Sequence, residues 1–286
     1  MRGIILAGGT GSRLWPSTIS VSKQLIPVYD KPLVYYPLST LMLAGIKDIL
    51  IITTPHDNSL FVKLLGDGSD LGINLSYEIQ DKPEGLAQAF IIGEKFIAES
   101  PVALILGDNI FHGAGFGRQL QNFSAPEGAI IFGYEVRDPH KYGVAEVNTQ
   151  GEVISLEEKP INPKSKLAIP GLYFFDNSVS QRARSVKKSA RGELEIISVL
   201  ESYLKSKRLN IQLIQRGTSW MDCGTVSSLN DASNYIRAIE DRQNRMVACI
   251  EEISYSNGWI TLSQLEKRAT FLGKNEYSEY LTRIML

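Results

Sequence analysis

Gly3-Ile4-Ile5-Leu6-Ala7-Gly8-Gly9-Thr10-Gly11-Ser12-Arg13 is the stretch that decides the fold. Its first five residues form a continuous apolar run, and glycine occupies three of the next four positions. Such short apolar runs are typical of strands buried on both faces of a parallel sheet. The glycines then predict a tight turn at the carboxyl end of that strand, where open α/β sheets bind their ligands.

The rest of the first half of the chain extends this pattern. Residues 49–52 and 102–106 are further apolar runs, with amphipathic segments between them. A helix is predicted over 35–44, ending at Gly45. A second helix is predicted from the helical spacing of Leu86, Ala89, Phe90, Gly93 and Ile97. The alternation predicts an α/β fold, with a Rossmann-like, mostly parallel open sheet and helices on both faces.

The pattern changes in the second half. Residues 129–175 consist of alternating, turn-punctuated segments such as 144–147 and 153–156, which indicate a small antiparallel subdomain. A helix is predicted after Thr225, and the residues that follow it are charged and helical in pattern. We therefore expect one main domain over 1–240 and a helical C-terminal appendage over 241–286, the candidate regulatory or oligomer region.

Composition and charge exclude several classes of protein. The chain has 286 residues, of which 43% are hydrophobic and 21% charged, and a net charge of -1. No overall positive field is available for nucleic acid or an anionic membrane, so neither is an expected partner. The two cysteines, Cys223 and Cys249, lack metal-type spacing. Because there is no signal-peptide pattern and no run of about 18 apolar residues, we expect a cytoplasmic protein.

The glycine-rich loop is a candidate phosphate site. Its backbone N–H groups can converge on a polyphosphate, and Arg13 adds a fixed positive fork. Lys23 follows ten residues later, within reach of the same anions. A purely steric turn and a solvated lysine would explain these residues equally well. Two phosphate loops are excluded, because Leu14 stands where a dinucleotide motif has its third glycine and no P-loop pattern occurs.

Two aspartates and one charged tetrapeptide are candidates for the chemistry. Asp108 follows the run 102–106 through one glycine, so its carboxylate is expected at a strand's carboxyl end, a place for Mg²⁺. Asp222 is the candidate second ligand, since a cation bound with a nucleotide needs only one or two carboxylates. Taken alone, both aspartates also suit turns or caps. Glu157-Glu158-Lys159-Pro160 is either a substrate-binding pair or a surface charge cluster.

Several segments resemble a known family. LAGGTGSRL (residues 6–14) followed by KQLIP (23–27) resembles the signature of sugar nucleotidyltransferases. QDKPEGLAQA (80–89) is similar to bacterial glucose-1-phosphate thymidylyltransferases, and the resemblance covers essentially the whole chain. It implies transfer of a thymidylyl group from dTTP to α-D-glucose 1-phosphate, which gives dTDP-glucose and pyrophosphate by in-line attack without a covalent protein intermediate.

The resemblance assigns roles to single residues. The catalytic residues that it implies are Arg13, Lys23, Asp108, Lys159 and Asp222. Nucleotide binding is assigned to Gly8, Gly9, Thr10, Gly11, Ser12, Arg13, Lys23, Gln24, Gln80, Gly85 and Asp108, of which Gln80 and Gly85 read the pyrimidine. Sugar-phosphate binding is assigned to Leu86, Asn109, Tyr142, Gly143, Glu158, Lys159, Tyr173 and Arg191. Asp108 and Asp222 hold Mg²⁺, the implied cofactor, and Cys223 stands where the family usually has threonine.

The family precedent also concerns assembly and pathway. It implies a homotetramer, a second nucleotide-sugar site near residues 246–252 for feedback, and the first step of dTDP-rhamnose or deoxysugar and polysaccharide biosynthesis. The antiparallel subdomain would then lie on the sugar side. Two alternatives stay open. One is the same chemistry with UTP or another sugar phosphate, because one methyl group is worth only about 1–3 kcal/mol in a pocket. The other is a non-catalytic nucleotide-sugar sensor on the same fold.

Overall fold

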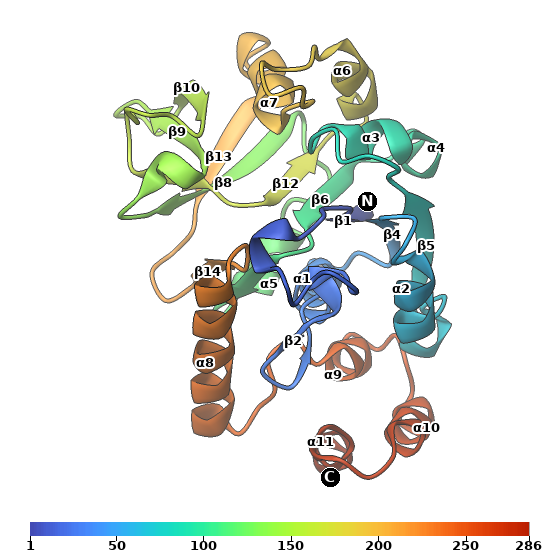
Figure 1. Cartoon of the computed structure of the whole chain (residues 1–286). Coiled ribbons are helices and arrows are strands. Elements are labelled where there is room, and N and C mark those ends of the chain that lie inside the picture. Colours follow the sequence, from blue (N-terminus) through green and yellow to red (C-terminus); the bar gives the residue numbers. More distant parts are fainter. Residues whose placement is uncertain (286) are drawn as a thin grey trace.

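One large open sheet lies at the centre of the computed structural model, which describes residues 1–285 (Figure 1). Its strands are β1 (Arg2–Ala7), β4 (Asp48–Thr53), β5 (Asn74–Ile79), β6 (Val102–Leu106), β8 (Ala129–Glu135), β9 (Gly143–Val147), β10 (Val153–Glu158), β11 (Leu167–Ile169), β12 (Leu172–Phe175) and β13 (Leu209–Leu213). Within the described residues their order is β10-β9-β11-β8-β12-β6-β1-β4-β5, and β13 pairs with β8. The expected open α/β sheet is thereby confirmed.

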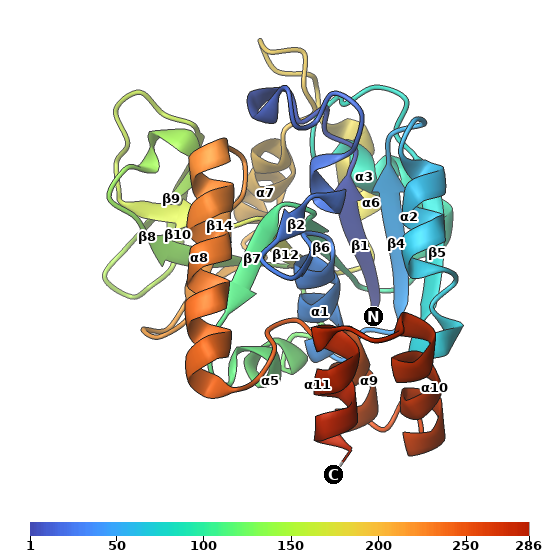
Figure 2. The same ribbon diagram turned by 60° about the horizontal axis from the view of Figure 1, so that its bottom comes forward.

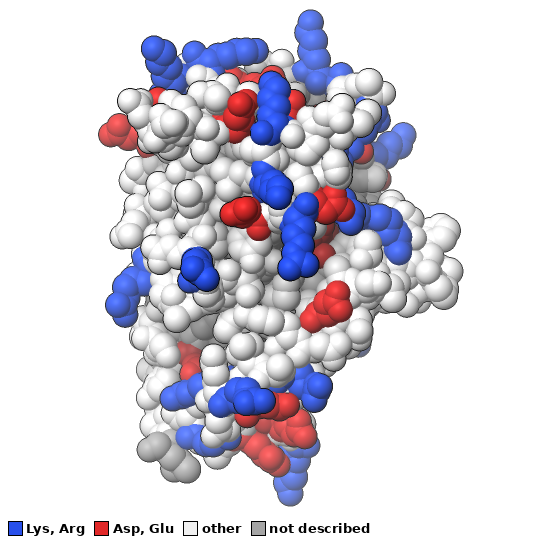
Figure 3. Space-filling model, turned by 90° about the vertical axis from the view of Figure 1, so that its left-hand side faces the viewer, with Lys and Arg blue, Asp and Glu red and all other residues white. Residues whose placement is uncertain are grey.

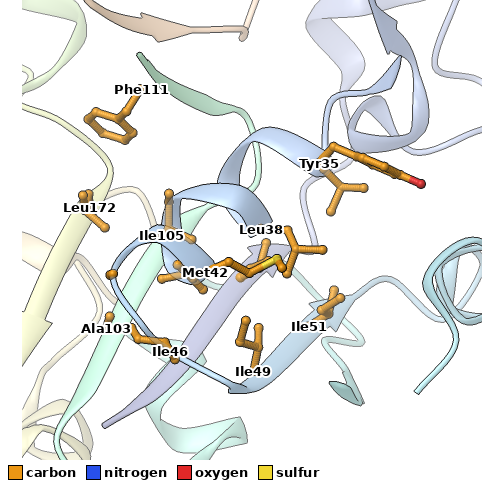
Figure 4. Packing of buried hydrophobic residues seen from close by; sticks show 14 of the residues in the cluster. Tyr35, Leu38, Met42, Ile46, Ile49, Ile51, Ala103, Ile105, Phe111 and Leu172 are labelled. Carbon is orange, nitrogen blue, oxygen red and sulfur yellow. The ribbon is translucent and has the colours of Figure 1, made fainter. Parts of the chain in front are cut away.

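The neighbouring strands β6, β1, β4 and β5 form the parallel part of the sheet. Successive residues of β1 enter different cores: Ile5 packs in one apolar cluster, and Ile4 and Leu6 pack in the other. Figure 4 shows the first cluster, where Leu38 and Met42 face the sheet. The continuous apolar runs of the sequence are explained by this burial on both faces.

Helices cover both faces, as the sequence predicts. The first cluster receives side chains from α1 (Tyr35–Leu43), α2 (Asn58–Leu65), α5 (Phe116–Gln121) and α9 (Ile250–Ser256). The second receives them from α3 (Gln88–Ile92), α4 (Glu94–Ile97), α6 (Val179–Ser185) and α7 (Ile196–Lys205). In Figure 1 the two sets of helices lie on opposite sides of the sheet. Helix α1 ends shortly before Gly45, as expected, and the φ of Gly45 is 80°, in the left-handed region.

The helix predicted from Leu86 to Ile97 is wrong as one continuous element. The structure divides this segment into α3 and α4, with Gly93 between them. A Cβ at Gly93 would lie 3.1 Å from Ile4 and from Leu50, so the chain passes flush against the sheet at this point. The apolar spacing that suggested a helix therefore reflects burial of one face, whereas the missing side chain allows the close approach and the break.

The remainder of the sheet is largely antiparallel, which confirms the change of pattern after residue 128. Strand β9 pairs with β10, β11 pairs with both β8 and β9, and β12 joins this part to β6. A separate two-stranded ribbon is formed by β7 (Asn109–His112) and β14 (Ser219–Asp222), and another by β2 (Pro27–Val28) and β3 (Lys31–Pro32).

The chain ends in four helices. These are α8 (Val226–Gln243), α9, α10 (Leu262–Leu272) and α11 (Glu276–Ile284). Cys249, Ile260, Leu265 and Leu281 form a separate apolar cluster among the last three helices. In Figure 2 these three lie below the sheet, at the end from which β1 starts, opposite the loop that follows β1. Because α8 runs through residue 240, the division at 240/241 stays a proposal.

Figure 3 shows the charged side chains on one face of the molecule. On the face in Figure 3, basic and acidic side chains are interspersed, as the net charge of -1 leads one to expect. Among residues 1–285, no helix is long and apolar enough to cross a membrane.

Candidate active site

The glycine-rich loop leaves the carboxyl end of β1, as predicted. A Cβ on Gly8 would overlap Oε1 of Gln80, so only glycine fits there without moving that side chain. Gly11 has a φ of 63°, and the short 3₁₀ turn Ser12–Leu14 follows it. Gly8 is thus required by the close approach of Gln80, and Gly11 by its left-handed backbone. The loop brings Arg13 to the lining of the cleft.

The two aspartates are brought together by a strand pairing that the sequence did not indicate. Asp108 lies two residues beyond β6, and β7 begins directly after it. Strand β7 pairs antiparallel with β14, in a register that sets Asn109 opposite Asp222. The backbone N–H of Cys223 donates to the carbonyl of Asp108 at 2.9 Å. Both carboxylates consequently line one cleft.

The charges around the two aspartates are unequal. Burial by itself raises the pKa of Asp108, but the ion pair with Lys23 and a hydrogen bond from Asn109 outweigh it and hold the pKa below its usual value. Burial and the Asp108 carboxylate raise the pKa of Asp222 to about 6. Lys23 and Arg13 oppose that shift without cancelling it. Two carboxylates in one cleft provide the oxygen ligands that a divalent cation prefers.

Asn109 holds the Asp108 carboxylate in place. Its Nδ2 donates to Oδ1 of Asp108 at 3.0 Å, and its own Oδ1 accepts from Trp220 Nε1 at 2.6 Å and from the backbone of Gly171 at 3.0 Å. The side chain is buried, so these partners leave it one orientation. Trp220 and Gly171 are distant from Asn109 in the sequence, so their support of Asn109 depends on tertiary contact.

The other wall of the cleft carries the tetrapeptide at the end of β10. Glu158 is the last residue of that strand, and burial raises the pKa of its carboxyl group. Lys159 has a φ of 46° and an Nζ that lies 3.5 Å from Glu158. Arg191 donates to Glu195 at 2.9 Å and to Glu158 at 3.3 Å. The alternating charges here are therefore paired with each other rather than scattered over the surface.

A single cleft of about 380 Å³ collects most of the predicted residues. It is lined by Gly9, Arg13, Lys23, Gln24, Gln80, Gly85, Leu86, Asp108, Asn109, Tyr142, Gly143, Glu158, Lys159, Tyr173, Arg191 and Asp222. Gly8, Thr10, Gly11 and Ser12 belong to the same loop but are not part of this lining. The lining also includes Lys141, Glu193, Glu195, Ile196, Ile197 and Trp220, to which the sequence assigned no individual role. Lys141, Glu193 and Trp220 lie within two residues of an assigned residue, so proximity in sequence was the available signal.

Comparison with known proteins assigns the family. The family model described as nucleotidyl transferase matches residues 2–239. Glucose-1-phosphate thymidylyltransferases of Mycolicibacterium smegmatis and Mycobacterium tuberculosis are 57% and 54% identical, each over 100% of this chain and 99% of the relative. A solved UDP-glucose pyrophosphorylase in complex with UDP-glucose superposes with a TM-score of 0.71 at 26% identity, over 85% of this chain and 99% of that one. The chain with this loop, aspartate pair and cleft belongs to the nucleotidyl transferase family.

Proposed function

We propose that this protein transfers a thymidylyl group from dTTP to α-D-glucose 1-phosphate, giving dTDP-glucose and pyrophosphate. The observation that carries the proposal is one cleft with cations on two sides of an aspartate pair. Arg13 and Lys23 lie toward the glycine-rich loop, and Lys159 and Arg191 lie on the other wall. Such a cleft suits two phosphorylated reactants that repel each other until their charges are neutralised.

The chemistry follows from this arrangement. An oxygen of the sugar phosphate attacks the α-phosphorus of dTTP in line, a new P–O bond forms, and the bond to the β-phosphate oxygen breaks to release pyrophosphate. Arg13 and Lys23 stabilise the charge on the transferring and leaving phosphates. Lys159 and Arg191 hold the attacking phosphate. Arg191 must exchange part of its pairing with Glu195 and Glu158 for that phosphate. No protein nucleophile is needed.

The aspartate pair fits a divalent cation, which members of this family generally use; we propose Mg²⁺. In residues 1–285 no group of three or more His, Cys, Asp or Glu side chains is placed to hold a metal alone. Two carboxylates suit Mg²⁺, because it takes its other ligands from phosphate and water. When bound, the ion neutralises phosphate charge and fixes the triphosphate. Asp108 and Asp222 would orient it, and Lys23 must exchange its ion pair with Asp108 for the phosphates.

The broader biological setting belongs to the same proposal. We place the protein in the cytoplasm, as a homotetramer at the first step of dTDP-rhamnose or deoxysugar synthesis for polysaccharides. The proposed feedback site lies near residues 246–252. A second cavity of about 200 Å³ supports that position, because Met246, Val247, Cys249 and Glu252 line it together with Phe111 and His112 of β7. Since β7 starts beside Asp108, a ligand there would touch the strand that positions the metal.

Pyrophosphate release tests the proposed reaction. Purified protein is assayed with Mg²⁺ across dTTP, dUTP and UTP, each with glucose 1-phosphate and with other hexose 1-phosphates. The dTTP and glucose 1-phosphate pair is expected to give the highest kcat/KM. A preference for UTP or another sugar would select the alternative substrate pair. Binding without turnover of any pair would leave a nucleotide-sugar sensor and sink the enzyme proposal.

A further inference from the structure

Gln80 has a carboxamide whose two ends meet different surroundings. The residue follows β5 and lines the cleft. Its Nε2 donates a hydrogen bond to Oε1 of Gln88 at 2.6 Å. Its Oε1 lies against Gly8, where the phosphate loop begins, and accepts from no protein group in the described part of the chain. In the proposed function the loop and the cleft hold the nucleotide, so this oxygen is available to its base.

The orientation of Gln88 is determined by groups that have only one hydrogen-bonding role. The backbone N–H of Glu84 donates to Gln88 Oε1 at 3.1 Å. The Nε2 of Gln88 faces Oε2 of Glu84 at 3.4 Å. A backbone N–H can only donate and a carboxylate can only accept, so a reversed Gln88 amide would lose both partners. Gln88 must therefore present oxygen, and not nitrogen, to Gln80.

The segment that carries Glu84 is itself fixed. Its carboxylate accepts from Lys188 at 2.6 Å, and its carbonyl accepts from the backbone of Leu194 at 2.6 Å. Ala87 donates to the carbonyl of Leu194 at 3.0 Å. Gly85 has a φ of 108°, and a Cβ there would overlap the Leu194 backbone. These contacts tie residues 84–88 to the chain before α7, so the reference point for Gln88 does not move freely.

These contacts from Glu84 through Gln88 leave Gln80 with one hydrogen-bonding pattern on the cleft side. Its Oε1 is an acceptor, and the N–H that Gln88 does not use is a donor. Thymine and uracil present a complementary edge, with N3–H as donor and O4 as acceptor. Cytosine presents N3 as acceptor and its N4 amino group as donor, so that like groups would face each other. A free amide would accommodate either base by turning over, whereas a fixed one does not.

We propose that Gln88 is a positioning residue that selects keto pyrimidines over cytosine by fixing the Gln80 carboxamide. The inference rests on the proposed function, because it assigns the base specificity of the same cleft. Gln88 acts through Gln80, and selection comes from groups left unpaired when the wrong base binds. Sites built on such hydrogen bonds discriminate strongly between substrates. Thymine and uracil differ only in a methyl group and present the same hydrogen-bonding edge, so Gln80 does not distinguish them.

The test compares base selectivity in Gln88→Leu and Gln88→Glu. Full-length enzyme is assayed for pyrophosphate release with glucose 1-phosphate and dTTP, dUTP or dCTP. The unaltered protein is expected to favour dTTP over dCTP by at least about 100-fold in kcat/KM. Gln88→Leu removes the acceptor, so this ratio should fall at least about tenfold. The dTTP to dUTP ratio and the KM for glucose 1-phosphate should stay unchanged.

Gln88→Glu is the matched control. One carboxylate oxygen still accepts from Gln80 and from the Glu84 backbone, so selectivity against dCTP should be retained. The other oxygen replaces the Nε2 that faces Glu84, so the melting temperature should fall by repulsion between the two carboxylates. An unchanged dTTP to dCTP ratio in Gln88→Leu, or equal losses with both nucleotides, would overturn the proposal. Should that variant not fold, Gln88→Met gives the same comparison. If the unaltered protein turns over no pair, the proposed function fails. The role of Gln88 is then tested by calorimetric binding of dTTP, dUTP and dCTP, in which Gln88→Leu should lower the dTTP to dCTP affinity ratio.

Discussion

A half-buried carboxylate in the cleft, Asp222, and a fully buried one in the C-terminal helices, Glu251, have opposite surroundings. Asp222 has Asp108 as a neighbour, and its pKa rises to about 6. Glu251 of α9 has no exposed surface, yet Arg268 donates to it at 3.0 Å and Tyr277 at 2.7 Å. Arg268 also reaches Asp70, which precedes β5, and so ties α10 to the main domain.

The difference separates a structural charge from one kept available for a ligand. A buried charge is tolerated when its hydrogen-bonding capacity is used, as it is at Glu251. At Asp222 no group within residues 1–285 donates a hydrogen bond to the carboxylate. Gly224 lies close to this carboxylate and to Arg13, since a Cβ there would be 3.2 Å from Asp222 Oδ1 and 3.0 Å from Arg13 Nη2. The fold thus accepts an unfavourable negative charge where the proposed metal ion would neutralise it.

Asp222→Asn tests the ligand side of the comparison and has the largest expected effect. Removing one carboxylate should lower kcat by roughly 1000-fold, because the metal and its nucleotide lose a charged ligand worth several kcal/mol. The melting temperature should stay level or rise, since repulsion with Asp108 disappears. Asp108→Asn should also abolish metal-dependent turnover with the fold retained. Near-normal turnover in either well-folded variant would remove that residue from the metal site.

Arg268→Met tests the structural side. It leaves Glu251 buried without its cation, which should destabilise the protein by about 3 kcal/mol in urea unfolding. Turnover per folded molecule should remain, because Arg268 is not in the cleft. Arg237→Met is the matched control: its partner Asp241 lies 3.8 Å away and both side chains are 58% exposed, so a change of less than about 0.5 kcal/mol is expected. Equal losses in the two variants would contradict the distinction.

Proton binding gives the smallest predicted effect. Burial and the neighbouring Asp108 carboxylate raise the pKa of Asp222 in the folded protein to about 6, so the folded state holds this proton more tightly than the unfolded chain. Its contribution to stability therefore declines as pH rises from about 4 to about 6. A metal needs the deprotonated form, so Mn²⁺ affinity, measured by calorimetry without nucleotide, should fall up to about tenfold per pH unit below pH 6. A flat profile between pH 5 and 7 would count against this.

Much of the fold and part of the site could be predicted from local sequence. The apolar runs at β1, β4 and β6, the helix ending at Gly45 and the antiparallel segments were predictable because burial and turn chemistry act over a few residues. Asp108 was predictable for the same reason, since its position follows from the end of β6. The break at Gly93 was not, because apolar spacing reports which face is buried and not whether the helix is continuous.

Sequence by itself determined the buried strands β1, β4 and β6 and the charged residue Asp108 beyond the end of β6, since apolar runs and turn chemistry are local properties. Tertiary structure alone decided that β14 pairs with β7, which brings Asp222 to Asp108, and that Trp220 holds Asn109. It likewise decided that Glu84, through Gln88, orients Gln80. Pairing register and amide orientation depend on partners distant in the chain, and those partners meet only after the core has packed.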